Sequence, residues 1–406
     1  MIQVVCKKET YLYNAYHMVK AFYPAQEVTS CVEEKASNYI TVRLPEGQEI
    51  SVAGEEGKKQ VDKELYQALC TYTGKTLAWG VLMGVRPTKI AMKELEGGMT
   101  REAFVPWVME DTSMSREKAE LSWDIAVREK ALLDRLDYEN GYSLYVGIPF
   151  CPSVCTYCSF SSGALSDWQD AVEDYLAALF KEIRAIADMC KGKCLNTIYI
   201  GGGTPTTLDA DQLERLLTCI EENFSKEHLL EYTVEAGRPD SVTREKLDVL
   251  RKHGITRISI NPQSMQQKTL DLIGRRHTVA DIYEVYALAR EVGFDNINMD
   301  IIAGLPGETV EDMKDTLQQI EQLSPDNLTV HSLAIKRAAK MGQKDSREYE
   351  EVLKERAQSQ NANEQMERMI QDASHAATRM GMTPYYLYRQ KNMAGNLENV
   401  GYAKVD

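Results

Sequence analysis

Residues 145–158 read YVGIPFCPSVCTYC and place three cysteines, Cys151, Cys155 and Cys158, at C-x3-C-x2-C spacing. The stretch from Ser143 to Pro149 is rich in β-branched and aromatic residues, which predicts a strand that leads into the cysteine loop. Three thiolates on one short loop can bind three irons of a cubane iron–sulfur cluster, although four thiolates are the usual set. The fourth iron would keep an open position, which a cluster needs if it is to bind and reduce a substrate.

A group of buried thiols or a three-ligand zinc site could also account for the cysteine triplet. Zinc sites usually combine a C-x2-C pair with a second pair of ligands, and the sequence has neither a second CxxC nor an HxxxH. The cysteines outside the motif are scattered over predicted helices and strands, as expected of small buried side chains in a reducing compartment. Cys190 and Cys194 repeat the x3 spacing, but they end a predicted helix and begin a predicted strand, so we interpret them as structural.

Composition limits the class of protein. A chain of 406 residues with 43% hydrophobic and 27% charged residues predicts an ordinary globular protein of two or three domains. Its net charge of −14 argues against a nucleic-acid partner, because neutralising phosphates requires a basic surface. No apolar run approaches the length of a membrane-spanning helix, and residues 1–9 lack the basic-then-apolar pattern of a signal peptide. We therefore expect a cytoplasmic protein without an integral membrane segment.

Strands and helices alternate from Ser143 onward. Six strands are predicted, at Ser143–Pro149, Leu195–Gly201, Leu230–Ala236, Arg257–Pro262, Asn296–Ala303 and Asn327–Leu333. Five helices separate them, at Trp168–Met189, Ala210–Asn223, Arg244–His253, Val279–Val292 and Val310–Leu323. This alternation predicts parallel strands with right-handed crossovers, and six such strands form an incomplete, curved α/β barrel.

Glycine and polar residues follow these strands at their carboxyl ends, where ligands bind to parallel sheets. The cysteine loop follows the first strand and Gly202-Gly203-Thr204-Pro205 follows the second, while Glu235 ends the third, Gln263 follows the fourth and Asp300 lies late in the fifth. Consecutive glycines let the backbone approach a ligand and present N–H groups to it. The sequence therefore predicts that five distant segments meet at one rim of the barrel.

The regions on either side of the barrel carry none of these motifs. Residues 1–140 are expected to form an α+β accessory domain, with elements at Ile2–Val5, Tyr11–Phe22, Tyr39–Leu44, Val61–Leu82, Pro87–Glu94, Arg101–Glu110 and Ser115–Leu136. A turn signal at Tyr138–Gly141 marks the boundary to a barrel domain of residues 141–335. Residues 336–406 are expected to be mostly helical, with a long helix over Glu348–Ala377, and to be an incomplete C-terminal region.

The motifs resemble a known superfamily. The C-x3-C-x2-C loop at the end of a strand resembles the radical S-adenosylmethionine (SAM) superfamily, over about half of the chain from Ser143 to Ala334. Residues 145–151 and the run GGGTPT at 201–206 resemble its oxygen-independent coproporphyrinogen III oxidase branch. Residues 384–402 are similar to the coproporphyrinogen dehydrogenase subgroup HemZ.

The resemblance implies a role for each motif residue. Cys151, Cys155 and Cys158 would bind a [4Fe-4S] cluster, and Tyr145, Gly202 and Glu235 would contact the SAM bound to it. The positions that hold a second SAM in the bacterial oxidase correspond to Tyr157, Gly203, Thr204, Gln263, Arg275, Asp300 and Ala334. Glu235 suits the amino group of SAM, Asp300 suits ribose hydroxyls, and Arg275 suits a carboxylate unless it is only a surface charge.

The resemblance also implies the reaction. A reduced cluster would give one electron to SAM, releasing methionine and a 5′-deoxyadenosyl radical that abstracts a hydrogen atom from a porphyrinogen propionate. Loss of carbon dioxide and one electron would leave a vinyl group, and two rounds would turn coproporphyrinogen III into protoporphyrinogen IX in haem biosynthesis. A flavodoxin or ferredoxin would be the reducing partner. Because the chain carries a net charge of −14, the anionic substrate requires a local basic pocket, with candidates Arg275, Arg276, Arg337 and Arg389.

Two departures from the oxidase branch bear on the function. Phe160 stands where the bacterial oxidase has a further cysteine and haem-chaperone relatives have an aromatic residue, which keeps open a haem-binding chaperone without decarboxylase activity. The chaperones' His-Asn-x-x-Tyr-Trp motif has its nearest equivalent at residues 395–400, without histidine or tryptophan, which favours the dehydrogenase. A plain electron-transfer or metal-binding protein is disfavoured, because a cluster with four protein ligands would leave no site for SAM.

Overall fold

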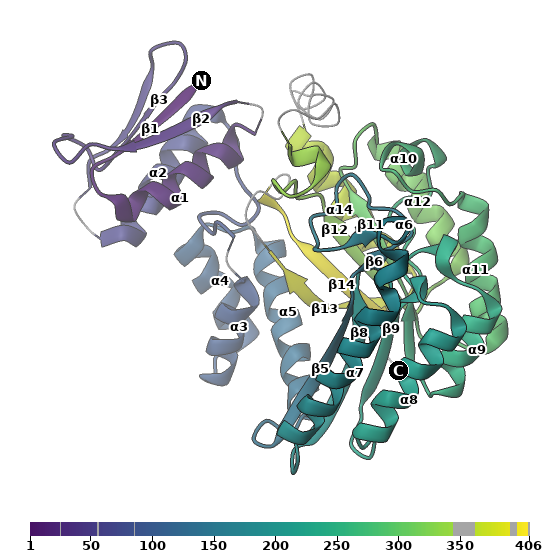
Figure 1. Cartoon of the computed structure of the whole chain (residues 1–406). Coiled ribbons are helices and arrows are strands. Elements are labelled where there is room, and N and C mark those ends of the chain that lie inside the picture. The colour runs from purple at the N-terminus through teal and green to yellow at the C-terminus, as the bar shows by residue number, and fades with distance from the viewer. Residues whose placement is uncertain (25, 55–56, 85, 344–361, 390–395, 405–406) are drawn as a thin grey trace.

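The computed structural model describes residues 1–24, 26–54, 57–84, 86–343, 362–389 and 396–404. It consists of a small N-terminal α+β domain, a group of helices, and a large curled sheet whose outer side is covered by helices (Figure 1). One hydrophobic core lies within residues 2–83, and a second core is shared by the helices that follow and the large sheet.

The N-terminal domain is a four-stranded sheet with two helices. The sheet has the order β2-β1-β3-β4, with strands β1 Ile2–Cys6, β2 Val28–Val32, β3 Ile40–Arg43 and β4 Glu49–Val52. Helices α1, Glu9–Phe22, and α2, Gly57–Thr73, pack against it. The sequence predicted β1, β3 and α1 but extended α2 to Leu82. The helix ends earlier because Gly74 adopts a φ of +68°, the left-handed conformation that commonly terminates helices.

Three helices follow, α3 Pro87–Glu96, α4 Arg101–Thr112 and α5 Arg116–Leu133. The side chains of Thr100 and Ser115 begin α4 and α5 by accepting hydrogen bonds from backbone N–H groups three residues later. Phe104 and Trp123 lie on the buried faces of these two helices, with ring centroids 5.0 Å apart. These residues belong to the core of the large sheet, so the helices pack with the barrel rather than with the N-terminal domain.

The large sheet has eight strands in the order β13-β14-β12-β11-β10-β9-β8-β5. Its six parallel strands are β5 Gly141–Ile148, β8 Cys194–Gly202, β9 Glu231–Glu235, β10 Arg257–Ser259, β11 Ile297–Ala303 and β12 Asn327–Ser332. They coincide with the six predicted strands to within a few residues. The curled, incomplete barrel confirms the predicted α/β fold class.

Helices connect the parallel strands and cover the outer face of the sheet (Figure 1). They are α6 Leu165–Trp168, α7 Val172–Met189, α8 Ala210–Asn223, α9 Arg244–Lys252, α10 Gln267–Leu272, α11 Val279–Val292 and α12 Val310–Leu323. Capping boxes begin α8, α11 and α12. In each, the N-cap side chain accepts a hydrogen bond from the backbone N–H of the third helical residue, whose own side chain accepts one from the backbone N–H of the N-cap residue. Two short strands, β6 Phe150–Cys151 and β7 Gly163–Ala164, pair with each other at the ends of the cysteine-bearing segment.

The two faces of the large sheet differ in burial. Residues that face the helices, such as Ile198, Val234 and Ile301, are fully buried. Their neighbours on the concave face, such as Tyr199 and Asp300, are half-buried. Because side chains of a strand alternate between its faces, this pattern identifies a polar concave surface that is accessible to solvent.

The C-terminal region corrects the expectation of a mostly helical extension. Helix α14, Ala362–Arg379, is followed by strands β13, Met382–Tyr388, and β14, Asn399–Lys404, and β14 pairs antiparallel with β12. Pro384 lies in the edge strand β13, beside a register shift between Pro384 and Tyr386. The first part of the predicted long helix, residues 348–361, lies outside the described residues.

A buried polar cluster connects the C-terminal segment to the helices. Glu398 is 1% exposed and accepts hydrogen bonds from Lys118 Nζ and Trp79 Nε1, each at 2.7 Å. The guanidinium of Arg389 lies 4.7 Å from the centroid of a Trp79 ring and donates to the carbonyl of Leu82 at 3.1 Å. Arg389 is 2% exposed, so the prediction that it belongs to a substrate pocket is wrong.

Candidate active site

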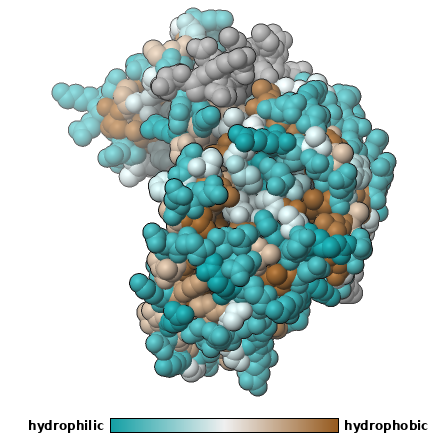
Figure 2. All heavy atoms as spheres, turned by 45° about the vertical axis from the view of Figure 1, so that its right-hand side comes forward, coloured by the Kyte–Doolittle hydropathy of each residue, from teal (hydrophilic) through white to brown (hydrophobic). Residues whose placement is uncertain are grey.

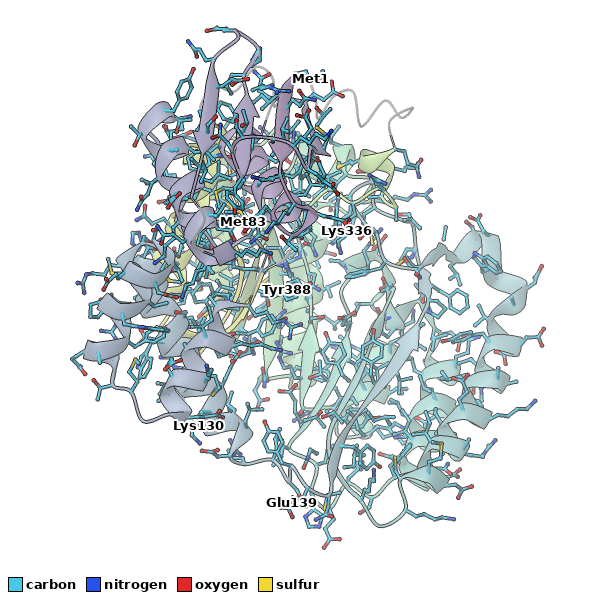
Figure 3. All side chains as sticks on the ribbon, turned by 90° about the vertical axis from the view of Figure 1, so that its left-hand side faces the viewer. Met1, Met83, Lys130, Glu139, Lys336 and Tyr388 are labelled. Carbon is cyan, nitrogen blue, oxygen red and sulfur yellow. The ribbon has the colours of Figure 1, made fainter. Side chains whose placement is uncertain are left out.

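All six parallel strands run toward one end of the molecule. Figure 3 shows Glu139, which precedes β5, at the lower end, and Lys336, which follows β12, at the upper end near the N-terminal domain. The six strands are neighbours in chain order, so their carboxyl ends form a continuous rim. The structure brings to this rim the cysteine loop, Gly202–Thr204, Glu235, Gln263 and Asp300.

The glycine loop after β8 lies directly against the cysteine loop. The backbone N–H groups of Gly203 and Thr204 donate to the carbonyls of Ile148 and Phe150, both at 2.7 Å. A Cβ atom at Gly203 would lie 2.6 Å from the Phe150 carbonyl oxygen and 3.1 Å from Cys151 Sγ. No side chain fits there, so a glycine at this position allows the two loops to touch.

Hydrogen-bond donors approach two of the sulfur atoms. Thr204 Oγ1 donates to Cys151 Sγ at 3.5 Å, and Arg238 donates to Cys155 Sγ at 3.6 Å. Within the described residues, no three His, Cys, Asp or Glu side chains converge as ligands of one metal ion. A mononuclear zinc site requires such convergence, whereas each cysteine of a cubane binds a separate iron. Three thiolates on one loop therefore suit the irons of a cubane cluster.

Arg238 supports the cysteine loop from behind. It is 3% exposed, donates to the carbonyl of Ser153 at 3.1 Å, and binds the carboxylate of Asp240 through two contacts of 2.9 and 2.7 Å. Burial acts to raise the pKa of Asp240, but the imidazole of His277, 3.8 Å away, and the hydrogen bonds from Arg238 hold it well below its ordinary value. The ionised Asp240 thus orients Arg238 toward Cys155 Sγ.

Arg275 lies beneath the cysteine loop and is not a surface charge. It is 6% exposed, and its Nη1 donates to the carbonyl of Asn261. Burial acts to lower its pKa, but the neighbouring Tyr157 and Cys155 raise it above the ordinary value for arginine. Its Nε has no hydrogen-bond partner among the described residues, which leaves one donor for a ligand.

Glu235 and Tyr199 form a hydrogen-bonded pair at the end of β9. The Tyr199 hydroxyl donates to Glu235 Oε1 at 2.5 Å. Tyr145, 61% exposed, stacks on Tyr199 with ring centroids 5.9 Å apart and 10° between the planes. Burial raises the pKa of Glu235 to about 7, the hydrogen bond from Tyr199 opposes this increase, and Asp300 adds to it. A carboxyl group in this state can release its proton to bind an ammonium group.

Gln263 and Asp300 occupy the next strand ends. Gln263 has a φ of +66°, which is uncommon for a residue other than glycine. Its N–H donates to the Asp300 carbonyl and its carbonyl accepts from the Ile302 N–H, both at 2.9 Å. Burial acts to raise the pKa of the Asp300 side chain, but His331, whose Nε2 lies 3.7 Å away, and a hydrogen bond from Asn298 lower it below its ordinary value. Asp300 is therefore an ionised acceptor at the rim.

The remaining predicted residues lie at different depths. Tyr157 packs against the core beneath the cysteine loop, beside Arg275. Ala334 is half-buried two residues after β12. Arg276 and Arg337 are exposed, so they remain candidates for contact with an anionic substrate.

Sequence reasoning missed three side chains of this region, Tyr199, Arg238 and Arg257. Tyr199 and Arg257 lie on the concave face and alternate with buried isoleucines, so strand periodicity could have identified them. Arg238 had no local signal, because its contact with the cysteine loop depends on tertiary packing.

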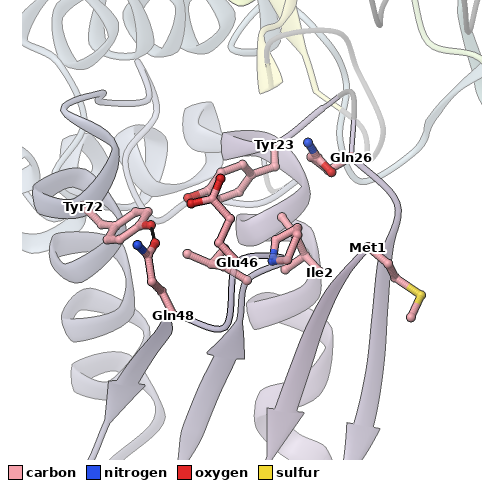
Figure 4. Close-up of a pocket in the computed structure, with 9 residues that line it drawn as sticks. Met1, Ile2, Tyr23, Gln26, Glu46, Gln48 and Tyr72 are labelled. Atoms are coloured by element: carbon pink, nitrogen blue, oxygen red, sulfur yellow. Dashed lines mark hydrogen bonds between the residues drawn. The ribbon is translucent and has the colours of Figure 1, made fainter.

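Elsewhere the molecule offers an open pocket in the N-terminal domain (Figure 4), where Tyr72 donates a hydrogen bond to Gln48. The pocket is lined by Met1, Ile2, Tyr23, Gln26, Leu44, Pro45, Glu46, Gln48 and Tyr72, none of them a predicted site residue. The face shown in Figure 2 is mostly hydrophilic with scattered hydrophobic patches. Among the helices that the structure describes, none has the length and apolarity needed to cross a membrane.

Comparison with known proteins identifies the family of the chain. Residues 145–320 match the family model of the radical SAM superfamily. The Bacillus subtilis oxygen-independent coproporphyrinogen-III oxidase-like protein HemZ is 38% identical over 417 residues, which cover 95% of this chain and 81% of HemZ. The Bacillus subtilis heme chaperone HemW is 36% identical over 194 residues, which cover 48% of this chain and 50% of HemW.

A solved structure of a related enzyme is similar to this chain. The structure of coproporphyrinogen III oxidase (HemN) from Escherichia coli, a radical SAM enzyme, superposes with a TM-score of 0.55 and 28% identity, covering 68% of this chain and 59% of HemN. The chain therefore belongs to the radical SAM superfamily, in the group of coproporphyrinogen III oxidase-like proteins that contains HemN, HemZ and HemW. The match spans only about half the length of HemW.

Proposed function

We propose that this protein is a radical SAM enzyme that converts coproporphyrinogen III into protoporphyrinogen IX without oxygen. The observation that carries the proposal is the contact between the cysteine loop and the glycine loop at one rim, next to the Glu235–Tyr199 pair. The similarity to HemZ over 95% of the chain and to the HemN structure supports a porphyrinogen substrate.

The proposed site divides the cofactors between two sets of residues. Cys151, Cys155 and Cys158 would hold a [4Fe-4S] cluster, and Tyr145, Gly202 and Glu235 would hold the SAM that binds its open iron. When bound, the cluster would supply the electron for the reductive cleavage of the SAM that these residues hold. The protein's own part is to orient SAM through Glu235 and to keep the reacting groups on the concave face.

A second SAM is part of the proposal. The residues assigned to it are Tyr157, Gly203, Thr204, Gln263, Arg275, Asp300 and Ala334. Gln263 and Asp300 support the assignment, because they adjoin Glu235 on the neighbouring strand ends. The Nε of Arg275 offers a donor, whereas Thr204 is already hydrogen-bonded to Cys151 Sγ.

Each propionate, –CH2–CH2–COO⁻, becomes –CH=CH2 by losing one hydrogen atom, one carbon dioxide and one electron. The hydrogen atom forms 5′-deoxyadenosine, and the electron passes to an oxidised one-electron carrier of the flavodoxin or ferredoxin class. The same class of carrier, when reduced, supplies the electron that cleaves SAM. Two rounds consume two SAM and release two carbon dioxide molecules per substrate.

Anaerobic turnover of the reconstituted protein tests this function. Coproporphyrinogen III, SAM and reductant are incubated with the protein, and tetra-, tri- and dicarboxylate porphyrins are separated by chromatography. Accumulation of the dicarboxylate product with two carbon dioxides released is expected. Cys155→Ser is the matched control and should give neither SAM cleavage nor product. SAM cleavage without loss of the tetracarboxylate would contradict the proposed reaction.

Phe160 favours a second candidate function, haem delivery. Phe160 lies two residues beyond Cys158 and is 72% exposed. The alignment with HemW, a heme chaperone, covers 48% of this chain. An exposed aromatic ring beside the cluster loop could contact a porphyrin. Stoichiometric haem binding by a preparation that leaves coproporphyrinogen III unchanged would support this alternative.

A further inference from the structure

One arginine on the concave face is not used by the proposed cofactor sites. Arg257 begins β10 and is paired in register with Thr233 of β9, which pairs in turn with Tyr199 of β8. Its sequence neighbour Ile258 faces the helices and is fully buried. Because adjacent strand residues point to opposite faces, Arg257 points into the half-barrel, in the same row as Tyr199.

The guanidinium of Arg257 has few protein partners. The side chain is half-buried and donates to the Tyr385 hydroxyl at 3.5 Å. Glu231 and Asp300 face it and influence it electrostatically, but each accepts a hydrogen bond from another side chain at 2.7 Å. Within the part of the chain that the structure describes, no carboxylate lies within ion-pair distance of Arg257.

Three buried arginines of this region, Arg238, Arg275 and Arg389, already bind protein groups. The Nε and Nη2 groups of Arg238 donate to the carboxylate of Asp240. Arg275 and Arg389 donate to backbone carbonyls. All three are nearly inaccessible to solvent. Arg257 differs because its side chain is only half-buried, and a planar guanidinium can bind a carboxylate in bidentate fashion.

Tyr385 reaches Arg257 from the C-terminal strands. It lies in β13 where the register shifts, and its ring packs on Gly401 of β14. A Cβ atom at Gly401 would lie only 3.2 Å from two ring carbons, so any larger residue would displace the ring. The two C-terminal strands therefore contribute the hydroxyl group that is hydrogen-bonded to Arg257.

The pair lies close to the proposed SAM site but deeper in the half-barrel. Glu235 follows Thr233 by two residues, and Thr233 is the register partner of Arg257. Two residues of a parallel strand span about 7 Å. A substrate that meets SAM at the rim can thus extend an acidic arm toward Arg257.

We propose that Arg257 and Tyr385 form a subsite for one carboxylate of a polycarboxylate substrate inside the half-barrel, an inference whose substrate class rests on the proposed function. The guanidinium would bind both carboxylate oxygens, and the tyrosine hydroxyl would add a further donor. The chain has a net charge of −14, so an anionic substrate requires such a local cation.

The test compares porphyrins that differ only in their charge. Coproporphyrin III, the oxidised tetracarboxylate, and its tetramethyl ester are titrated into the cluster-loaded chain, and quenching of porphyrin fluorescence reports binding. Arg257→Gln should raise the Kd of the tetracarboxylate about ten- to a hundredfold, the range for a lost hydrogen bond to a charged group. The Kd of the ester and the binding of SAM should not change.

Two more conservative substitutions control for the possibility that Arg257→Gln fails to fold. Arg257→Lys keeps the charge but loses the bidentate geometry, and Tyr385→Phe loses only the hydroxyl, so each should weaken tetracarboxylate binding less than Arg257→Gln. Arg184→Gln removes an exposed charge from α7 and serves as the matched control.

Unchanged affinity for coproporphyrin III in Arg257→Gln would overturn the subsite, as would an equal loss for the ester. The binding test of this subsite can be distinguished from the test of the proposed reaction. If the wild-type protein fails to decarboxylate coproporphyrinogen III but Arg257→Gln selectively loses the tetracarboxylate, the subsite stands and the decarboxylase function falls.

Discussion

Lowering the pH is expected to weaken SAM binding through Glu235. Burial raises the pKa of this carboxyl group to about 7, and its proposed role requires the ionised form to receive the amino group of SAM. The proton must therefore leave when SAM binds. The affinity for SAM is highest at pH values well above the pKa of Glu235, and it falls as the pH drops through that pKa.

The size of the effect follows from the pKa. With a value of about 7, roughly one tenth of the carboxyl groups are ionised at about pH 6 and roughly nine tenths at about pH 8. The apparent Kd varies inversely with the competent fraction, so it should be about tenfold higher at the lower pH. Tyr199→Phe removes a hydrogen bond that lowers this pKa, which should move the midpoint to higher pH.

Equilibrium dialysis of SAM with the cluster-loaded protein over this pH range provides the measurement. Glu235→Gln cannot ionise and should bind SAM weakly at every pH, while the absorbance of the cluster persists. Glu227→Gln changes an exposed carboxyl group before β9 and should leave the profile intact. A flat wild-type profile, or a pH dependence that survives in Glu235→Gln, would refute the reasoning.

Three further predictions concern the cluster and the fold. Cys155→Ser should lose the iron and sulfide of the reconstituted protein, expected at about four each; wild-type content would contradict the cluster assignment. Arg238→Gln removes a charged donor 3.6 Å from Cys155 Sγ and should lower the reduction potential in a redox titration, with Arg184→Gln as control. Glu398→Ala removes the buried acceptor of Trp79 Nε1 and the shorter of the two carboxylate contacts of Lys118 Nζ, and it should lower the free energy of unfolding by about 3–5 kcal/mol in urea. Glu117, 61% exposed, should contribute less than about 1 kcal/mol when changed to glutamine, and equal effects of the two changes would refute the buried pair.

The barrel could be predicted because its signals are local. Alternation of polar and apolar residues, with capping boxes before α8, α11 and α12, falls within short windows of sequence. The prediction was wrong where a distant partner changes the outcome. Strands β13 and β14 exist because β14 pairs with β12, about seventy residues earlier in the chain, and a short window of sequence does not contain such a partner.

The sequence specified the chemistry of the rim but not the charges that face the substrate. Cysteine spacing is a property of one loop, and strand order alone brings Glu235 and Asp300 beside it. The sequence offered Arg275 and Arg389 alike as candidates for an anionic ligand, yet packing buries one beneath the cysteine loop and the other against Trp79. Arg257, which belongs to no sequence motif, faces the half-barrel because of its register with β9. A side chain's direction and partners depend on residues far away in the chain, and only the folded molecule brings these together.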